Sequence, residues 1–298
     1  MIRPIKVLIL HRSLLPGGFV LLWSTGFIGA RLADPYIEPL TLLAIRMVIA
    51  ATLLGLIAFA TQAPWPKSVQ MAFHIAMAGL LVHATYLSGV FIAINLGQAA
   101  GVTAILVALQ PLLTATLVGP LLGEQVTRWQ WLGLLLGLAG VIFVISGRIE
   151  GGVITPGTLA ASLFALIGIT LGTLYQKRFC PQTDLRTGGA IQFAASAAVL
   201  IPAALIFETQ TIEWTGELIF ALAWLVLVLS VGAIGLLYAL IRRGDASRVA
   251  SLFYLAPPFT VLLAWLFFGE QLGPSALLGL GIVVLGVALV QRRPAATT

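Results

Sequence analysis

Residues 121–141 read LLGEQVTRWQWLGLLLGLAGV, and residues 266–287 read LFFGEQLGPSALLGLGIVVLGV. Both stretches contain the tripeptide Gly-Glu-Gln, at 123–125 and at 269–271, which lie 146 positions apart. The same shift also aligns further identical residues without a gap: Ala100, Ala104, Leu106, Leu109, Pro111, Thr114, Leu132, Gly133, Gly140 and Val141, with 246, 250, 252, 255, 257, 260, 278, 279, 286 and 287. Agreement of this density indicates an internal duplication.

The composition excludes a water-soluble domain. Hydrophobic residues make up 60% of the chain and charged residues 9%, and the mean hydropathy is +1.07. A helix needs roughly 20 apolar residues to cross the hydrocarbon core. The apolar runs lack the alternation of a transmembrane barrel strand. We therefore expect an all-α membrane protein with ten transmembrane helices, near residues 13–31, 39–60, 69–94, 99–119, 129–146, 155–177, 187–207, 217–241, 247–268 and 274–291.

Each half of the chain then holds five helices, in the predicted repeats 1–148 and 149–298. Because five is odd, the second repeat must enter the membrane from the opposite side. The result is a pair of inverted repeats about an axis in the membrane plane.

The basic residues provide a separate test of this topology. Of the 16 Lys and Arg residues, only Arg31 and Arg148 fall in predicted outer loops, and Arg46 lies within a helix. The others fall on the inner side if the N-terminus is cytoplasmic: Arg3, Lys6, Arg12, Lys67, Arg128, Lys177, Arg178, Arg186, Arg242, Arg243, Arg248, Arg292 and Arg293. This bias places both termini in the cytoplasm. The net charge of +6 therefore reflects topology and not a nucleic-acid partner.

Each repeat has a proline in its fourth helix, then Gly-Glu, then a glycine-bearing fifth helix. Together with Pro39, Arg46 and the pair Trp23-Ser24, this pattern resembles the EamA branch of the drug/metabolite transporter superfamily, over nearly the whole chain. The resemblance implies a bacterial cytoplasmic-membrane exporter of metabolites, similar to the YddG-type aromatic amino acid exporters. The second repeat departs from the pattern at Gln192, where the counterpart of Arg46 is expected.

The charged residues near the membrane have two interpretations each. Arg46 either anchors a substrate carboxylate or, as we favour here, is structural and contacts carbonyl groups, Asp34 or Glu38 near the outer surface. Glu124 and Glu270 follow helix ends, where a carboxylate stabilises the next helix start, so we interpret both as structural and not as catalytic or proton-carrying groups. A capping box is expected at the start of the fifth helix, from 127 to 130.

Polar and aromatic residues recur at helical spacing in helices that the resemblance assigns to the wall of a central cavity. Each one alone is more typical of a structural hydrogen bond. Their recurrence favours a shared substrate site lined by Trp23, Ser24, His83, Tyr86, Thr103, Gln110, Thr173, Ser230, Tyr238 and Tyr254. Such a site suits a small zwitterion or an uncharged amphipathic metabolite. Pro111 and Pro257 each remove a backbone hydrogen bond, and we expect them to act as hinges.

Chemistry by the protein itself finds little support. The sequence offers no metal site, catalytic triad or phosphate loop, so we expect no cofactor, no metal and no enzymatic activity. The partners we expect are a small-molecule substrate, such as an amino acid, and the lipid bilayer. A lipid-linked carrier flippase and, more weakly, an intramembrane enzyme stay open as alternatives, as does the oligomeric state.

Overall fold

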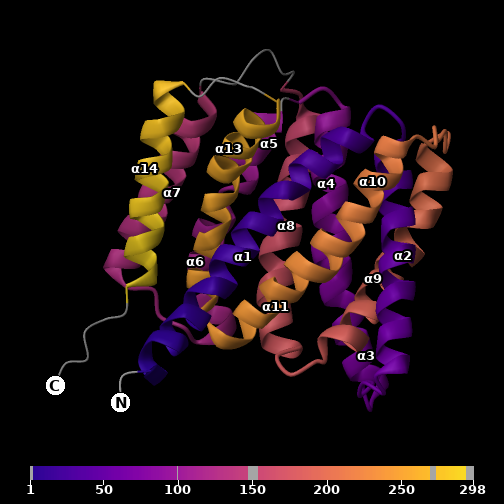
Figure 1. Ribbon diagram of the computed structural model, residues 1–298, viewed down its shortest axis with the longest axis horizontal. Helices are drawn as coiled ribbons and strands as arrows, with labels where there is room; N and C mark the ends of the chain where they lie inside the picture. Colours follow the sequence, from indigo (N-terminus) through magenta and orange to yellow (C-terminus); the bar gives the residue numbers. More distant parts are fainter. Residues whose placement is uncertain (1–2, 99, 147–153, 269–272, 293–298) are drawn as a thin grey trace.

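The computed structural model describes residues 3–98, 100–146, 154–268 and 273–292, and every regular element within these ranges is a helix (Figure 1). The first half contains α1 (Arg3–Ala33), α2 (Pro39–Ala60), α3 (Val69–Gly79), the π-helical segment η1 (Leu80–Thr85), α4 (Tyr86–Asn95), α5 (Ala100–Val107), α6 (Gln110–Leu122) and α7 (Arg128–Ser146). The all-helical prediction is therefore confirmed for these residues.

The second half has matching elements in the same order. They are α8 (Pro156–Phe179), α9 (Leu185–Phe207), α10 (Gly216–Trp224), the π-helical segment η2 (Leu225–Ala233), α11 (Ile234–Arg243), α12 (Ala246–Ser251), the 3₁₀ segment η3 (Leu252–Leu255), α13 (Ala256–Phe268) and α14 (Pro274–Gln291). Shifted by 146, the bounds of α2 to α7 agree with those of α9 to α14 to within two residues, except that η3 has no named counterpart.

Eight helical stretches in the described residues are long and apolar enough to cross a membrane: Pro39–Ala60, Val69–Asn95, Val102–Leu122, Arg128–Ile145, Pro156–Phe179, Leu185–Phe207, Gly216–Arg243 and Pro274–Gln291. These correspond to eight of the ten predicted spans. The remaining two predictions, 13–31 and 247–268, fall on α1 and on α12, η3 and α13. The chain is a multi-pass helical membrane protein.

The most extensive helix contacts join α7 to α14 and α2 to α9, so each of these helices packs against its own counterpart in the other half (Figure 1). Glycines allow the α7–α14 approach. A Cβ atom on Gly133 would lie 2.5 Å from the carbonyl oxygen of Gly286, and one on Gly286 would lie 2.6 Å from that of Gly133. No larger residue fits here, because real Cβ atoms do not approach backbone this closely.

The direction of the chain differs between the two halves. In Figure 1, α1 begins at the lower end of the bundle, whereas α8 begins at the upper end. The last described helix, α14, ends at the lower end, where α1 begins.

Local signals in the sequence set the helix ends around the opening motif. α6 ends at Gly123, whose φ of 70° is the left-handed conformation that glycine adopts without strain. The predicted capping box is present: the Thr127 N–H donates to the Gln130 side chain at 2.9 Å, and the Gln130 N–H donates to the Thr127 hydroxyl at 3.3 Å. These two features fix the turn that carries Glu124 from α6 into α7.

Candidate functional site

Two adjoining cavities lie inside the bundle. Cavity A has a volume of about 50 Å³, and its lining includes Thr103, Gln110, Phe253 and Pro257. Cavity B has a volume of about 100 Å³. Its lining includes Arg46, His83, Phe91, Leu225 and Leu229. The linings share Trp23, Tyr86, Val90 and Ile94. Each cavity is smaller than the roughly 300–1,000 Å³ of pockets that hold drug-sized ligands.

An aromatic cluster stands where the two cavities meet. The Trp23 and Tyr86 rings are stacked, with centroids 6.4 Å apart and planes at 16°. Phe253 meets Trp23 edge-on at 5.1 Å, and Phe19 lies 5.3 Å from Trp23. Rings in these arrangements attract one another beyond the gain from burial alone. The cluster forms a firm apolar wall that an apolar group can contact from either cavity.

Arg46 provides the charge of cavity B. Only 7% of the residue is exposed, and its Nε donates a hydrogen bond to the Ser230 hydroxyl at 2.9 Å. The outer-surface contacts that we expected for Arg46 are not the ones it makes. Glu38, one of the expected partners, accepts a hydrogen bond from Thr209 instead. The structure thus places Arg46 in the cavity wall.

His83 lies beside Arg46 in the same lining. It is 2% exposed, its ring packs against Phe193 with centroids 4.4 Å apart, and its Nε2 has no hydrogen-bond partner among the described residues. Leaving a buried ring nitrogen without a hydrogen bond costs free energy. His83 therefore lines cavity B together with Arg46 and has one buried ring nitrogen without a partner among the described residues.

Both π-helical segments border cavity B. η1 contributes His83, and η2 contributes Leu225 and Leu229 to the lining and Ser230 to the Arg46 contact. π-helical turns are rare and occur frequently at functional sites. The two segments occupy equivalent positions in the two halves, so the widened turn belongs to the duplicated unit.

Cavity A has neutral polar groups. The Thr103 hydroxyl donates to the Gln98 side chain at 3.2 Å, and Ser162 donates to the same oxygen at 2.6 Å. Gln110 donates to the Thr114 hydroxyl at 3.4 Å, while its own Oε1 has no partner among the described residues. Gln110 thus lines cavity A and has one buried acceptor atom without a partner among the described residues.

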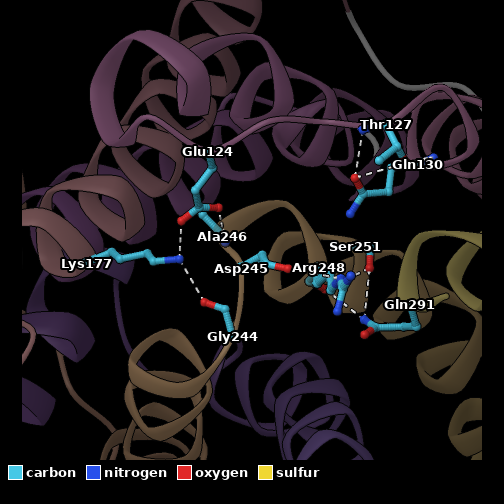
Figure 2. A network of polar contacts seen from close by, with 10 residues as sticks. All are labelled: Glu124, Thr127, Gln130, Lys177, Gly244, Asp245, Ala246, Arg248, Ser251 and Gln291. Carbon is cyan, nitrogen blue, oxygen red and sulfur yellow. Dashed lines mark hydrogen bonds and ion pairs between the residues drawn. The ribbon is translucent and has the colours of Figure 1, made fainter. Parts of the chain in front are cut away.

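Below cavity A the bundle is closed. A third cavity, lined by Gln110, Phe253, Thr173 and Lys177 among others, measures only about 10 Å³, which is room for about one water. Figure 2 shows the polar contacts of Lys177, which lines this cavity. Lys177 pairs with Glu124 and donates to the Gly244 carbonyl at 2.7 Å.

Glu124 connects the two halves of the chain at this end. Its second oxygen accepts a hydrogen bond from the backbone N–H of Ala246 at 2.9 Å, at the start of α12 (Figure 2). We expected this carboxylate beside the start of α7, and the structure places it at the start of a helix from the other half. Glu270, its counterpart, lies outside the described residues.

The predicted hinge prolines coincide with breaks in the helices. The turn at 108–109 separates α5 from α6 just before Pro111, and the 3₁₀ segment η3 precedes Pro257 at the matching position. Proline at the second residue of each new helix needs no backbone hydrogen bond there. Pro257 also lines cavity A, which connects the break directly to the site.

The structure brings five of the predicted site residues into the linings of cavities A and B: Trp23, His83, Tyr86, Thr103 and Gln110. Thr173 lines the small cavity below, and Ser230 holds Arg46 without lining a cavity itself. The other three are buried and do not line these cavities: Ser24, Tyr238 and Tyr254. Ser24 donates to the Val20 carbonyl at 2.7 Å.

The role of Arg46 in a substrate site was the less favoured of the two interpretations given for it, although it lines cavity B. Phe253 and Lys177 also line cavities and were not among the predicted site residues. No group of three or more His, Cys, Asp or Glu within the described ranges is arranged to hold a metal ion.

One titratable group outside the spans has a shifted pKa. Burial raises the pKa of the Cys180 thiol to about 11, although a hydrogen bond with Thr183 opposes the change. Cys180 is the single cysteine of the chain and follows the end of α8. A thiol with so high a pKa is a poor nucleophile at neutral pH.

The model of the EamA-like transporter family matches residues 17–146 and again 155–292. The chain belongs to the EamA-like transporter family. Its two matches cover both halves, as the internal duplication predicts. The family is one of transporters.

Relatives with transporter names agree with this membership, and a solved structure shares the fold. The chain is 27% identical to the "uncharacterized inner membrane transporter YedA" of Escherichia coli K12, over 91% of this chain and 87% of that protein. It is 23% identical to a "probable amino-acid metabolite efflux pump" of Salmonella typhimurium, over 90% of each chain. A protein crystal structure covers 93% of this chain and 95% of its own, with a TM-score of 0.77 and 22% identity, which shows the shared fold.

Proposed function

We propose that this family member is a secondary transporter that exports small metabolites, amino acids above all, across a bacterial cytoplasmic membrane. The observation that carries the proposal is the pair of small cavities inside the bundle, with polar groups and an aromatic wall. The names of the relatives support the membrane and the substrate class. No feature of the site favours the flippase alternative, which would need a lateral opening for a lipid.

The proposed architecture has ten transmembrane helices in two inverted repeats, 1–148 and 149–298, with both termini in the cytoplasm. The matching element bounds and the opposite starts of α1 and α8 support it. On this topology the contact of Glu124 with Lys177 closes the cytoplasmic side. Alternating access then requires that contact to break while the opposite side closes.

In the proposed site, Gln110 and His83 orient the polar groups of the substrate, and Trp23 and Tyr86 form the apolar wall. Thr103 and Thr173 add hydroxyl groups along the path. Ser230 positions Arg46. Tyr238, Tyr254 and Ser24 support the wall from behind, and Pro111 and Pro257 act as hinges.

The test is uptake of radiolabelled amino acids into proteoliposomes. Gln110→Ala and Tyr86→Ala are expected to lower uptake at least several-fold without lowering the amount of folded protein, because both side chains line the cavities. Ser196→Ala is the matched control, since Ser196 is buried in α9 away from the cavities and donates to a backbone carbonyl. Normal transport by both cavity variants overturns the proposed site, and no transport of any amino acid by the unaltered protein overturns the substrate class.

A further inference from the structure

We propose that cavity B is a carboxylate-binding site in which the Arg46 guanidinium pairs with the carboxylate of the substrate, whose apolar group lies against the aromatic wall. This inference rests on the proposed transport function and deepens it by naming the group that the site recognises. The ligand class is a monocarboxylate with an apolar side group, which includes apolar amino acids and their deaminated analogues.

The first argument is the unsatisfied capacity of Arg46. A guanidinium has five N–H donors in a planar fork that matches a carboxylate. Within the described part of the chain, the Nε–Ser230 contact is the one hydrogen bond that Arg46 makes, and no carboxylate pairs with it. The terminal nitrogens are therefore available to a ligand in the cavity that Arg46 lines.

The Ser230 contact also orients the fork. The Nε of Arg46, on α2, is held by the Ser230 hydroxyl of η2, so one edge of the guanidinium is tied to the second half of the chain. A side chain fixed in this way loses less freedom when a ligand binds, and bidentate carboxylate binding is more favourable as a result. The hydrogen bond to Ser230 thus orients the Arg46 side chain, and because the serine hydroxyl is neutral, the positive charge of the guanidinium has no counter-charge among the described residues.

The second argument is the charge balance. Arg46 is the one charged side chain among the described residues that line cavities A and B. A charge within a membrane span is costly unless it meets a partner or water. A monocarboxylate neutralises this site, whereas an ammonium group finds no carboxylate there. The amine of an amino acid is therefore tolerated and not required.

The third argument is the rest of the lining. Phe91, Leu225 and Leu229 join the shared Trp23 and Tyr86 around the guanidinium. An apolar group next to the carboxylate removes this surface from water when it binds. A ligand with several charges, such as a nucleotide, finds neither the volume nor the additional cations that it needs.

The experiment measures ligand-induced thermal stabilisation of the purified full-length protein, which reports binding without transport. The probes are L-leucine, L-methionine, L-phenylalanine and 3-phenylpropionate, each compared with its primary amide. The amide keeps the size and shape and removes the negative charge. The unaltered protein is expected to bind the acids at least 10-fold more tightly than the amides, with 3-phenylpropionate bound no more weakly than phenylalanine.

The Arg46→Gln variant is expected to bind the acids about 10- to 100-fold more weakly, from the strength of hydrogen bonds to charged groups, and to lose the preference for acid over amide. Arg46→Lys keeps the buried cation and serves if the first variant does not fold. It is expected to keep the acid preference with weaker binding, because lysine lacks the planar fork. Ser196→Ala is the control and is expected to keep the acid preference of the unaltered protein.

Three results overturn the carboxylate site: none of the acids stabilises the protein, acids and amides bind equally, or Arg46→Gln keeps the acid preference. Failure of the transport proposal looks different. If the acid preference depends on Arg46 but no acid is taken up into liposomes, the carboxylate site is supported and the proposed export function is refuted. If amino acids are taken up but acids and amides stabilise the protein equally, the transport function is supported and the carboxylate contact of Arg46 is refuted.

Discussion

Glu124→Gln is expected to open the cytoplasmic end of the bundle. The substitution keeps the size of the side chain and removes the negative charge that pairs with Lys177. The substitution should affect the cytoplasmic end of the bundle and not the outer end. The reason is that Glu124 of the first repeat contacts Lys177 of α8 and the N–H of Ala246 at the start of α12. When this end opens, the contact must break.

The solvent exposure of the Glu124–Lys177 pair determines how much free energy the closed state loses. The Lys177 and Glu124 side chains are 20% and 21% exposed, between a surface pair, which stabilises by roughly 0.2–1 kcal/mol, and a buried pair, whose breakage costs about 3–5 kcal/mol. We estimate a loss of about 1–3 kcal/mol for the closed state. At about 1.4 kcal/mol for each factor of ten, this raises the open population about 5- to 150-fold.

The assay is the labelling rate of a cysteine placed in the small lower cavity. Ala250 lines that cavity and is 3% exposed. In an Ala250→Cys, Cys180→Ala background, labelling by N-ethylmaleimide occurs only when the end opens, so its rate tracks the open population. Glu124→Gln is expected to raise the rate within the range above.

Asp245→Asn is the matched control for this experiment. Asp245 lies in the same turn, but it pairs with Arg248 one helical turn away and is 54% exposed. Its removal leaves the contact between the repeats intact, so the labelling rate should change less than twofold. An unchanged rate in Glu124→Gln, or an equal increase in both variants, refutes the assignment of this contact as the closure.

Three further outcomes are expected. Pro111→Ala or Pro257→Ala should slow transport with little change in substrate affinity, because alanine removes the ring that interrupts the helix and supplies the N–H that a continuous helix across the break would use; two variants with normal rates exclude the hinges. The native Cys180 should react with maleimide at pH 7.5 about 100-fold more slowly than a free thiol, since burial raises its pKa to about 11 from the ordinary 9.0; fast labelling of the folded protein contradicts that burial. A reporter fused to the C-terminus should behave as cytoplasmic, and an external reporter would mean that the ten-helix topology is wrong.

The helices and their repetition are predictable because they depend on local properties of the sequence. The length of an apolar run decides whether it can cross a bilayer, and a shift of 146 aligns residues of the two halves directly. Gly123 and the 127–130 capping box likewise act within a few residues. Each of these predictions needs only neighbours in the chain.

The cavity linings are less predictable, because helix geometry changes where the site is built. Ser251 and Tyr254 are three residues apart, which suggests one shared face of an α-helix. However, the backbone is 3₁₀ over Leu252–Leu255, and Tyr254 turns toward α7, where its ring fills the space beside Gly137. The apolar stretch Leu225–Ala233 gives no sign in its composition that it is π-helical. Arg46 could not be placed, since its partner Ser230 lies 184 positions away.

The duplicated frame holds an asymmetric site. Position 46 of α2 corresponds to position 192 of α9. Each of these helices packs against the π-helical segment of the other repeat. However, Arg46 lines cavity B, whereas Gln192 donates a hydrogen bond to Gln176 at 2.8 Å. A second arginine would bring another charge into the span at a cost of about 2.5–3.5 kcal/mol. It would also leave the ligand with two cations for one carboxylate. A single guanidinium lets one monocarboxylate neutralise the site, so the departure from symmetry at Gln192 is what matches the site to a ligand of one negative group.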